Sequence, residues 1–241
     1  MKMMLIELQK EKRTGIPYLF LSVGALGAAY ALLIFKIRKN SLLSLPMQPM
    51  DILLTQVYGM IMILNMLGIV LACCMIYHME FAGSAVKKMY LLPMNISTMY
   101  LCKFLILTIM FIVATGIQNL MLAKVGLMYL PEGTFQINAL LQFWGYSVLT
   151  SMPVLSGMLF LSSLFEKMWI SIGIGVAGFL SAMALGVSKK LLFLIHPFVV
   201  MLRPAVVMSA KPDNMVIIFA IAETILFFFA GLWTSHKLHY E

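Results

Sequence analysis

Long stretches without a charged residue constrain this chain more than any other feature of its sequence. No Asp, Glu, Lys or Arg occurs in residues 14–35, 52–79, 104–123, 133–165 and 168–188, and residues 214–236 are interrupted only by Glu223. A helix needs about 20 predominantly apolar residues to cross the hydrocarbon core of a bilayer. The sequence therefore predicts an all-α integral membrane protein with six transmembrane helices in a single domain over residues 1–241.

Composition excludes most other classes. Of the 241 residues, 62% are hydrophobic and 11% are charged, whereas soluble domains carry about 45–50% apolar and about 25% charged residues. A soluble enzyme, a disordered chain, a collagen and a disulfide scaffold are therefore excluded. The net charge of +8 fits loops beside anionic lipid headgroups, so we expect membrane lipid and no nucleic acid as a partner.

Within the charge-free stretches, we place the spans at residues 16–36, 52–79, 104–123, 138–165, 168–188 and 215–236. Pro153 should kink or break the fourth span. Lys and Arg divide nine to eight between the two sides of this arrangement, so the positive-inside rule hardly decides the orientation.

Two apolar segments are too short to span. Residues 1–13 place Met1, Met4, Leu5 and Leu8 on one helical face before a charged run, which predicts an amphipathic helix in the membrane interface. Residues 191–202 are split by His196-Pro197 and closed by Arg203-Pro204, which predicts a hairpin between the fifth and sixth spans. A frayed loop is the alternative for each segment.

Three groups of residues inside the spans have structural interpretations. The small residues Gly178, Ala182 and Gly186 favour close helix packing within the subunit over a dimer contact. The uncharged polar residues should form hydrogen bonds between helices; they are Gln56, Asn65, Gln118 and Asn119. The three cysteines show no metal-binding spacing and are expected to be reduced thiols.

The sequence shows no catalytic residues and no metal site. It contains no Gly-Lys dipeptide and hence no phosphate-binding loop, and no H-E-x-x-H zinc motif. Glu223 is the most polar residue within a span. A carboxylate there is costly and faces the bundle interior or a wet cavity, so a substrate or proton contact and a packing role both stay open.

The segment between the second and third spans combines charge with an apolar face. It begins at Glu80 and Gly83, and Val86, Met89 and Tyr90 then fall at helical spacing around Lys87 and Lys88, before Leu91, Leu92 and Pro93. This pattern predicts a short helix that ends at Pro93 and could dock in a groove of a partner. A plain loop with two solvated lysines is the alternative.

Together with the opening Leu5, Glu7, Lys10 and Arg13, this segment resembles the ABC-2 family of ABC-transporter permeases. The matching positions are Glu80, Gly83, Lys87, Lys88, Leu91, Leu92 and Pro93, followed by Lys103 at the entry to the third span. The resemblance implies a bacterial plasma-membrane exporter subunit with cytoplasmic termini, an N-terminal interfacial helix and an extracytoplasmic hairpin. The segment from Glu80 would be the cytoplasmic coupling helix, with Glu80 held by Lys87 or Lys88.

The same resemblance implies that the chain is not an enzyme and binds no cofactor. A separate ABC ATP-binding subunit would hold ATP and Mg, and a second permease subunit would complete the transporter. The chain's size is similar to that of the permeases of lantibiotic and bacteriocin self-immunity, which implies an amphiphilic or peptide substrate. A proton-coupled secondary transporter using Glu223 and a non-transporting sensor subunit are the alternatives.

Overall fold

The computed structural model describes residues 2–12, 14–81, 96–186, 194–207 and 211–237. The described residues form helices joined by short turns and contain no strand. The helices are α1 (Lys2–Lys12), α2 (Ile16–Leu43), α3 (Pro49–Asp51), the π-helix η1 (Ile52–Gln56), α4 (Tyr58–Phe81), α6 (Ile96–Tyr129), α7 (Ile137–Leu164), α8 (Met168–Gly186), α9 (Pro197–Val207) and α10 (Asn214–Lys237).

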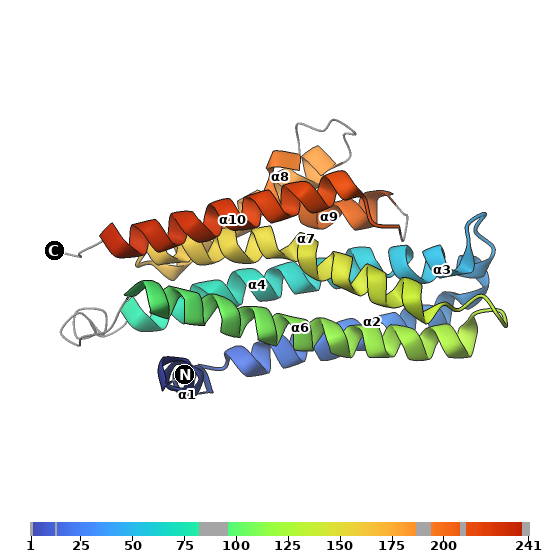
Figure 1. Ribbon diagram of the computed structural model, residues 1–241. Helices are drawn as coiled ribbons and strands as arrows, with labels where there is room; N and C mark the ends of the chain where they lie inside the picture. The colour runs from blue at the N-terminus through green and yellow to red at the C-terminus, as the bar shows by residue number, and fades with distance from the viewer. Residues whose placement is uncertain (1, 13, 82–95, 187–193, 208–210, 238–241) are drawn as a thin grey trace.

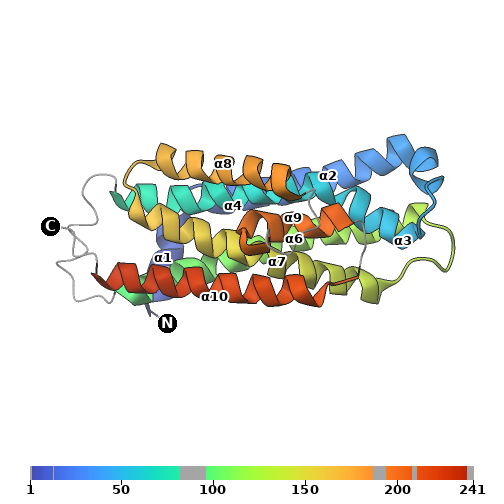
Figure 2. The ribbon, with the colours of Figure 1, turned by 90° about the horizontal axis from the view of Figure 1, so that it is seen from above.

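Six of these elements are long and apolar enough to cross a membrane, as the sequence predicts. They are α2, α6, α7, α8, α10 and one continuous span in which α3, η1 and α4 follow each other without a break. They lie side by side in an elongated bundle, whereas α1 lies across the bundle axis at one end (Figures 1 and 2). This crosswise direction is the one that a helix in the membrane interface would take.

Two spans extend well beyond their charge-free cores. α2 continues past Lys36, Arg38 and Lys39 with a local distortion at Arg38, and α6 includes both Lys103 and Lys124. Helical hydrogen bonding does not require an apolar side chain, and lysine stems can lie along the helix while the ammonium group reaches a polar partner. The charge-free stretches therefore mark the apolar part of each helix and not its ends.

α7 is the central helix of the bundle. It is the most buried of the six spans and packs against α4, α6, α9 and α10. Pro153 lies inside α7, and the helix continues through it. α8 and α10 are the least buried spans, and their outer faces carry Trp169 and Trp233 at 82% and 62% exposure. Such apolar outer faces suit contact with lipid.

The segment before the last span forms a helix that folds back on the bundle. α9 begins at Pro197, which fits the first position of a helix because proline has no N–H to leave unpaired there. α9 continues beyond the apolar segment, through Arg203 and Pro204 to Val207. α9 packs against α7 and α8, which explains how a short helix with an internal proline is held.

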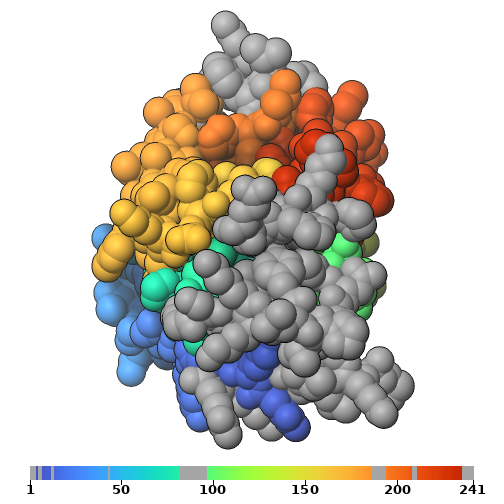
Figure 3. All heavy atoms as spheres, turned by 90° about the vertical axis from the view of Figure 1, so that its left-hand side faces the viewer, coloured from blue at the N-terminus to red at the C-terminus, as the bar shows by residue number. Residues whose placement is uncertain are grey.

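Both terminal helices reach the same end of the bundle. α1, the last turn of α4, the first turn of α6 and the C-terminal end of α10 lie on the left in Figure 1. Figure 3 looks onto this end, with α1 in blue along the lower edge and α10 in red above. An even number of spans returns the chain to the side on which it began. The ends of α1, α4, α6 and α10 therefore lie at one surface.

Candidate functional site

A cluster of buried charges lies where α1 packs against α6, near the last turn of α4. We call it the charged junction and define it by Glu7, Glu11, Tyr77, Glu80 and Lys103. Lys103 is only 2% exposed, and its Nζ forms an ion pair with Oε2 of Glu80. The same Nζ lies 4.4 Å from the centre of the Tyr77 ring, which adds a cation–π contact.

Tyr77 and Glu80 are three residues apart on α4 and therefore share a face of that helix. Both hold Lys103, which lies one to two turns inside α6. Burying an ammonium group is unfavourable without such partners. The pair consequently joins α4 to α6 immediately before the chain enters residues 82–95.

α1 brings two further carboxylates to the charged junction. Glu7 is 3% exposed, and its Oε1 accepts a hydrogen bond from Nζ of Lys10 at 2.8 Å. Glu11, one turn further along α1, is 1% exposed, and neither of its oxygens has a hydrogen-bond partner among the described residues. Burial, and then the negative charge of Glu7, raise the pKa of Glu11 from 4.5 to about 7, although Lys103 acts in the opposite direction.

The charged junction contains only part of the predicted coupling site. Glu80 is present, and within the described residues it forms an ion pair with Lys103 of α6. Nine predicted residues lie outside the described part of the chain: Gly83, Val86, Lys87, Lys88, Met89, Tyr90, Leu91, Leu92 and Pro93. Of the predicted N-terminal residues, Glu7 and Lys10 form the ion pair above, Leu5 lies on α1, and Arg13 is outside the described residues.

Sequence reasoning did not single out Glu11 or assign Lys103 to Glu80. The sequence does contain a hint for Glu11 and one for Lys103. Glu11 follows Glu7 by four residues and shares its helical face, and Lys103 interrupts an otherwise apolar start of a span. The contact itself could not be predicted, because Glu80 and Lys103 are separated by a segment whose conformation the sequence leaves open.

A polar layer crosses the middle of the bundle. Asn65 of α4 and Gln118 of α6 exchange two hydrogen bonds, Nδ2 to Oε1 at 3.1 Å and Nε2 to Oδ1 at 2.7 Å. Gln118 Nε2 also donates to the backbone oxygen of Val23 in α2 at 3.2 Å. Three helices are therefore tied together, which confirms the expected interhelical bonding for these two residues.

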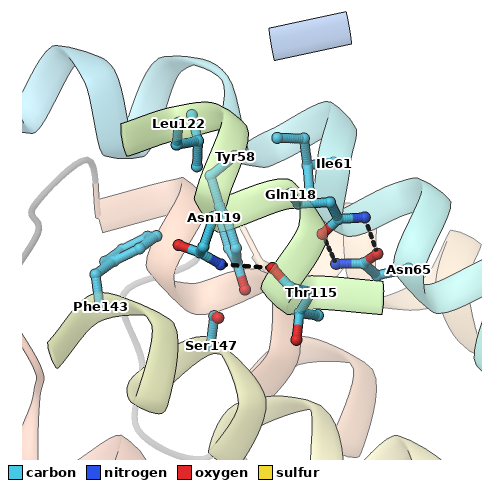
Figure 4. A pocket seen from close by; sticks show the side chains of 9 residues that line it. All are labelled: Tyr58, Ile61, Asn65, Thr115, Gln118, Asn119, Leu122, Phe143 and Ser147. Atoms are coloured by element: carbon cyan, nitrogen blue, oxygen red, sulfur yellow. Dashed lines mark hydrogen bonds between the residues drawn. The ribbon is translucent and has the colours of Figure 1, made fainter. Parts of the chain in front are cut away.

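A small cavity adjoins this layer (Figure 4). Its polar lining includes Tyr58, Thr115, Asn119 and Ser147, and the hydroxyl of Tyr58 points toward Ser147. Asn119 donates to the backbone oxygen of Thr115 at 2.9 Å, within its own helix, and its side-chain oxygen has no partner. The cavity offers about 10 Å³, which is room for about one water molecule, so it is too small for a transported molecule.

Glu223 lies in α10 with 9% exposure, and neither carboxylate oxygen has a hydrogen-bond partner. Phe227, one turn later, packs beside Gly157 of α7, and both helices run in the same direction (Figure 1). Glu223 is therefore at the level of Pro153, where the missing N–H of proline frees the backbone oxygen of Leu149.

The opposite end of the bundle carries an open groove of about 470 Å³. Its polar lining comes from three separate segments and includes Gln48, Asp51, Gln136, Gln142 and Lys211. In the described residues, no group of three or more His, Cys, Asp or Glu side chains could hold a metal ion. Cys73, Cys74 and Cys102 are buried free thiols, as expected from their spacing.

The six long apolar helices and the buried polar groups between them define a multi-pass α-helical membrane protein. The chain belongs to the ABC-2 family of transporter proteins, because the model of the family described as ABC-2 family transporter protein matches residues 3–182. The matched region includes the charged junction and ends within α8, before Glu223. No curated protein and no solved structure matches the chain.

Proposed function

We propose that this protein is the permease subunit of an ABC-2 type exporter. The observation that carries the proposal is the Glu80–Lys103 ion pair in a chain of this family. It anchors the last turn of α4 to α6 at the point where the chain enters residues 82–95. A partner that pulls on this segment would therefore move two membrane-spanning helices and not a loop alone.

The energy would come from a separate ABC ATP-binding subunit. That subunit would hold ATP and Mg, since this sequence has no phosphate-binding loop. Its docking would involve the apolar face formed by Val86, Met89 and Tyr90. ATP-driven closure would shift the equilibrium between inward- and outward-open arrangements of two permease subunits, identical or homologous.

The substrate would be amphiphilic or a peptide and would be moved out of the membrane or the cell. Glu223 is the residue we assign to its path, because an unpartnered buried carboxylate can accept a hydrogen bond or a positive charge. A role in self-immunity against a lantibiotic or bacteriocin fits the size of the chain. With the N-terminus in the cytoplasm, eight Lys and Arg residues lie on the outer side. Their positive charge disfavours cationic peptides as substrates.

Charge reversal in the coupling segment tests the docking. The double variant Lys87→Glu/Lys88→Glu should lose most of the ATP-binding subunit in co-purification from the native host. The matched control is Lys36→Glu/Lys124→Glu, which changes the net charge equally at exposed sites near the other end of the bundle. Unchanged recovery of the ATP-binding subunit after deletion of residues 84–92, in a chain that still inserts and folds, would contradict the proposal.

A proton-coupled secondary transporter is the second candidate, and the burial of Glu223 favours it. Liposomes that contain the chain alone separate the two functions. Uptake or release of a fluorescent cationic amphiphile under a pH gradient, abolished by Glu223→Gln, would establish the secondary transporter. We expect no transport without the ATP-binding subunit and ATP. A sensor subunit would transport in neither condition although it binds the ATP-binding subunit.

A further inference from the structure

Among the side chains that the structure describes, the charged junction holds more carboxylates than ammonium groups. Glu7, Glu11 and Glu80 share the site with Lys10 and Lys103, and Lys10 is engaged by Glu7. Lys103 is therefore the one described cation left for two carboxylates, Glu80 on α4 and Glu11 on α1. In this structure it pairs with Glu80, while both oxygens of Glu11 and Oε1 of Glu80 have no hydrogen-bond partner in the described part of the chain.

Glu11 is close enough to Lys103 and Glu80 for their charges to act on its own. α1 packs against α6, and lysine carries three N–H donors on a flexible four-carbon stem, which lets its ammonium group change partners. A buried carboxylate without a partner is costly, and this cost is relieved either by a proton or by a cation. Glu11 can therefore be relieved either by holding a proton or by receiving Lys103.

We propose that Lys103 is a switching residue with two alternative acceptors, Glu80 as in this structure and Glu11 in a second state. In the first state, Lys103 ties the last turn of α4 to α6, and Glu11 holds a proton. In the second state, Lys103 ties α1 to α6, Glu11 is ionised, and α4 is released at its junction with residues 82–95. The exchange would couple the N-terminal helix to the segment that we expect to meet the ATP-binding subunit.

The groups around Glu11 determine the sign of the pH effect. The charges that act on it are Glu7 from α1, Lys103 from α6 and Glu80 from α4, whereas Lys10 is paired with Glu7. The first tyrosine of α2, Tyr18, is 75% exposed. A carboxyl group with a raised pKa in the folded state stabilises the fold fully below its unfolded pKa. This contribution is lost as the pH rises from 4.5 to about 7.

The test uses the full chain in detergent micelles and five variants. They are Glu11→Gln, Glu80→Gln and the double variant of both, with Glu7→Gln and Glu7→Gln/Glu80→Gln as the matched controls. Thermal unfolding is followed with a maleimide dye, because the three buried cysteines react only when the chain opens. Each single variant leaves Lys103 one acceptor. The double variant should therefore lower Tm at pH 7.5 by more than the sum of the single shifts, whereas the control pair should be additive.

The pH profiles provide a second readout. The Tm of the parent chain should fall between pH 5 and pH 7.5, and Glu11→Gln should remove this fall. Glu80→Gln should remove it as well, because Lys103 then pairs with ionised Glu11, and Glu7→Gln should keep it. If Glu80→Gln does not fold, Glu80→Asp shortens the first acceptor and should give a smaller fall than the parent chain.

Additive shifts for Glu11→Gln and Glu80→Gln would overturn the proposal, and so would an unchanged fall in Tm for Glu80→Gln or for Glu80→Asp. The measurement needs no ATP-binding subunit, although the role we give the switch in transport rests on the proposed function. Failure of the two-acceptor switch and failure of subunit docking are therefore seen in different experiments. If the ATP-binding subunit still co-purifies but the Tm shifts are additive, the exporter proposal stands and the two-acceptor proposal for Lys103 is wrong.

Discussion

Single polar side chains supply specific contacts between spans that are otherwise apolar. The Asn65–Gln118 pair and the bond from Gln118 to the backbone of Val23 connect α4, α6 and α2. Hydrocarbon offers these amides no alternative partner, although measured bonds between transmembrane helices contribute only about 0.6 kcal/mol on average and up to about 1.7. Their main effect is to fix the register of three helices.

Gln118→Ala should destabilise the fold by about 1–2 kcal/mol, because it leaves Asn65 buried without its partner. Unfolding in SDS, followed by circular dichroism, measures the change. Asn138→Ala removes an exposed amide and should have almost no effect. The pair Asn65→Leu/Gln118→Leu should recover part of the loss, and a double variant less stable than Gln118→Ala would contradict this explanation.

At the scale of whole helices, packing of α9 against α8 requires small residues at the contact. A Cβ atom on Gly178 of α8 would lie 2.6 Å from the ring of Phe198 in α9, which is closer than side chains pack. Ala182, one turn later, is fully buried. For these two residues the small-residue stripe packs within the subunit, as expected, and its function is to seat the short helix α9.

Gly178→Val should therefore displace Phe198 and destabilise the fold by about 1–3 kcal/mol, the range for overpacked cores. Gly173→Val is the matched control on the same helix, because nothing lies near its Cβ position. Limited proteolysis in detergent should cut Gly178→Val faster between α8 and α10 than the parent chain. Equal cleavage of the two variants would show that α9 does not depend on this contact.

The whole molecule has two ends with different chemistry, and labelling can determine which one faces the cytoplasm. Glu132 and Glu166 are exposed in the turns before and after α7, at opposite ends of the bundle. The native cysteines are buried, so they give little background. In intact cells, a membrane-impermeant maleimide should label Glu132→Cys, and Glu166→Cys only after permeabilisation. The reverse pattern would invert the orientation.

Hydropathy predicted the six spans because the cost of burying charge in lipid is large and local in sequence. It did not predict that α6 would run from Ile96 to Tyr129, since Lys103 is neutralised by a residue that only the fold brings near. It also gave no sign that α9 would continue through Pro204, where packing against α7 and α8 outweighs one missing hydrogen bond. Predictions thus failed where a distant contact offsets a local cost.

The length of α6 has a mechanical consequence. Its 34 residues correspond to a rod of about 51 Å, well beyond the roughly 30 Å of the hydrocarbon core. One end carries Lys103, and the other carries Lys124 and the Tyr129 ring that Lys39 approaches at 5.6 Å. A tilt of about 5° about one end displaces the other by about 4 Å. α6 can therefore act as a lever that converts a change of ion-pair partner on one side of the membrane into motion on the other.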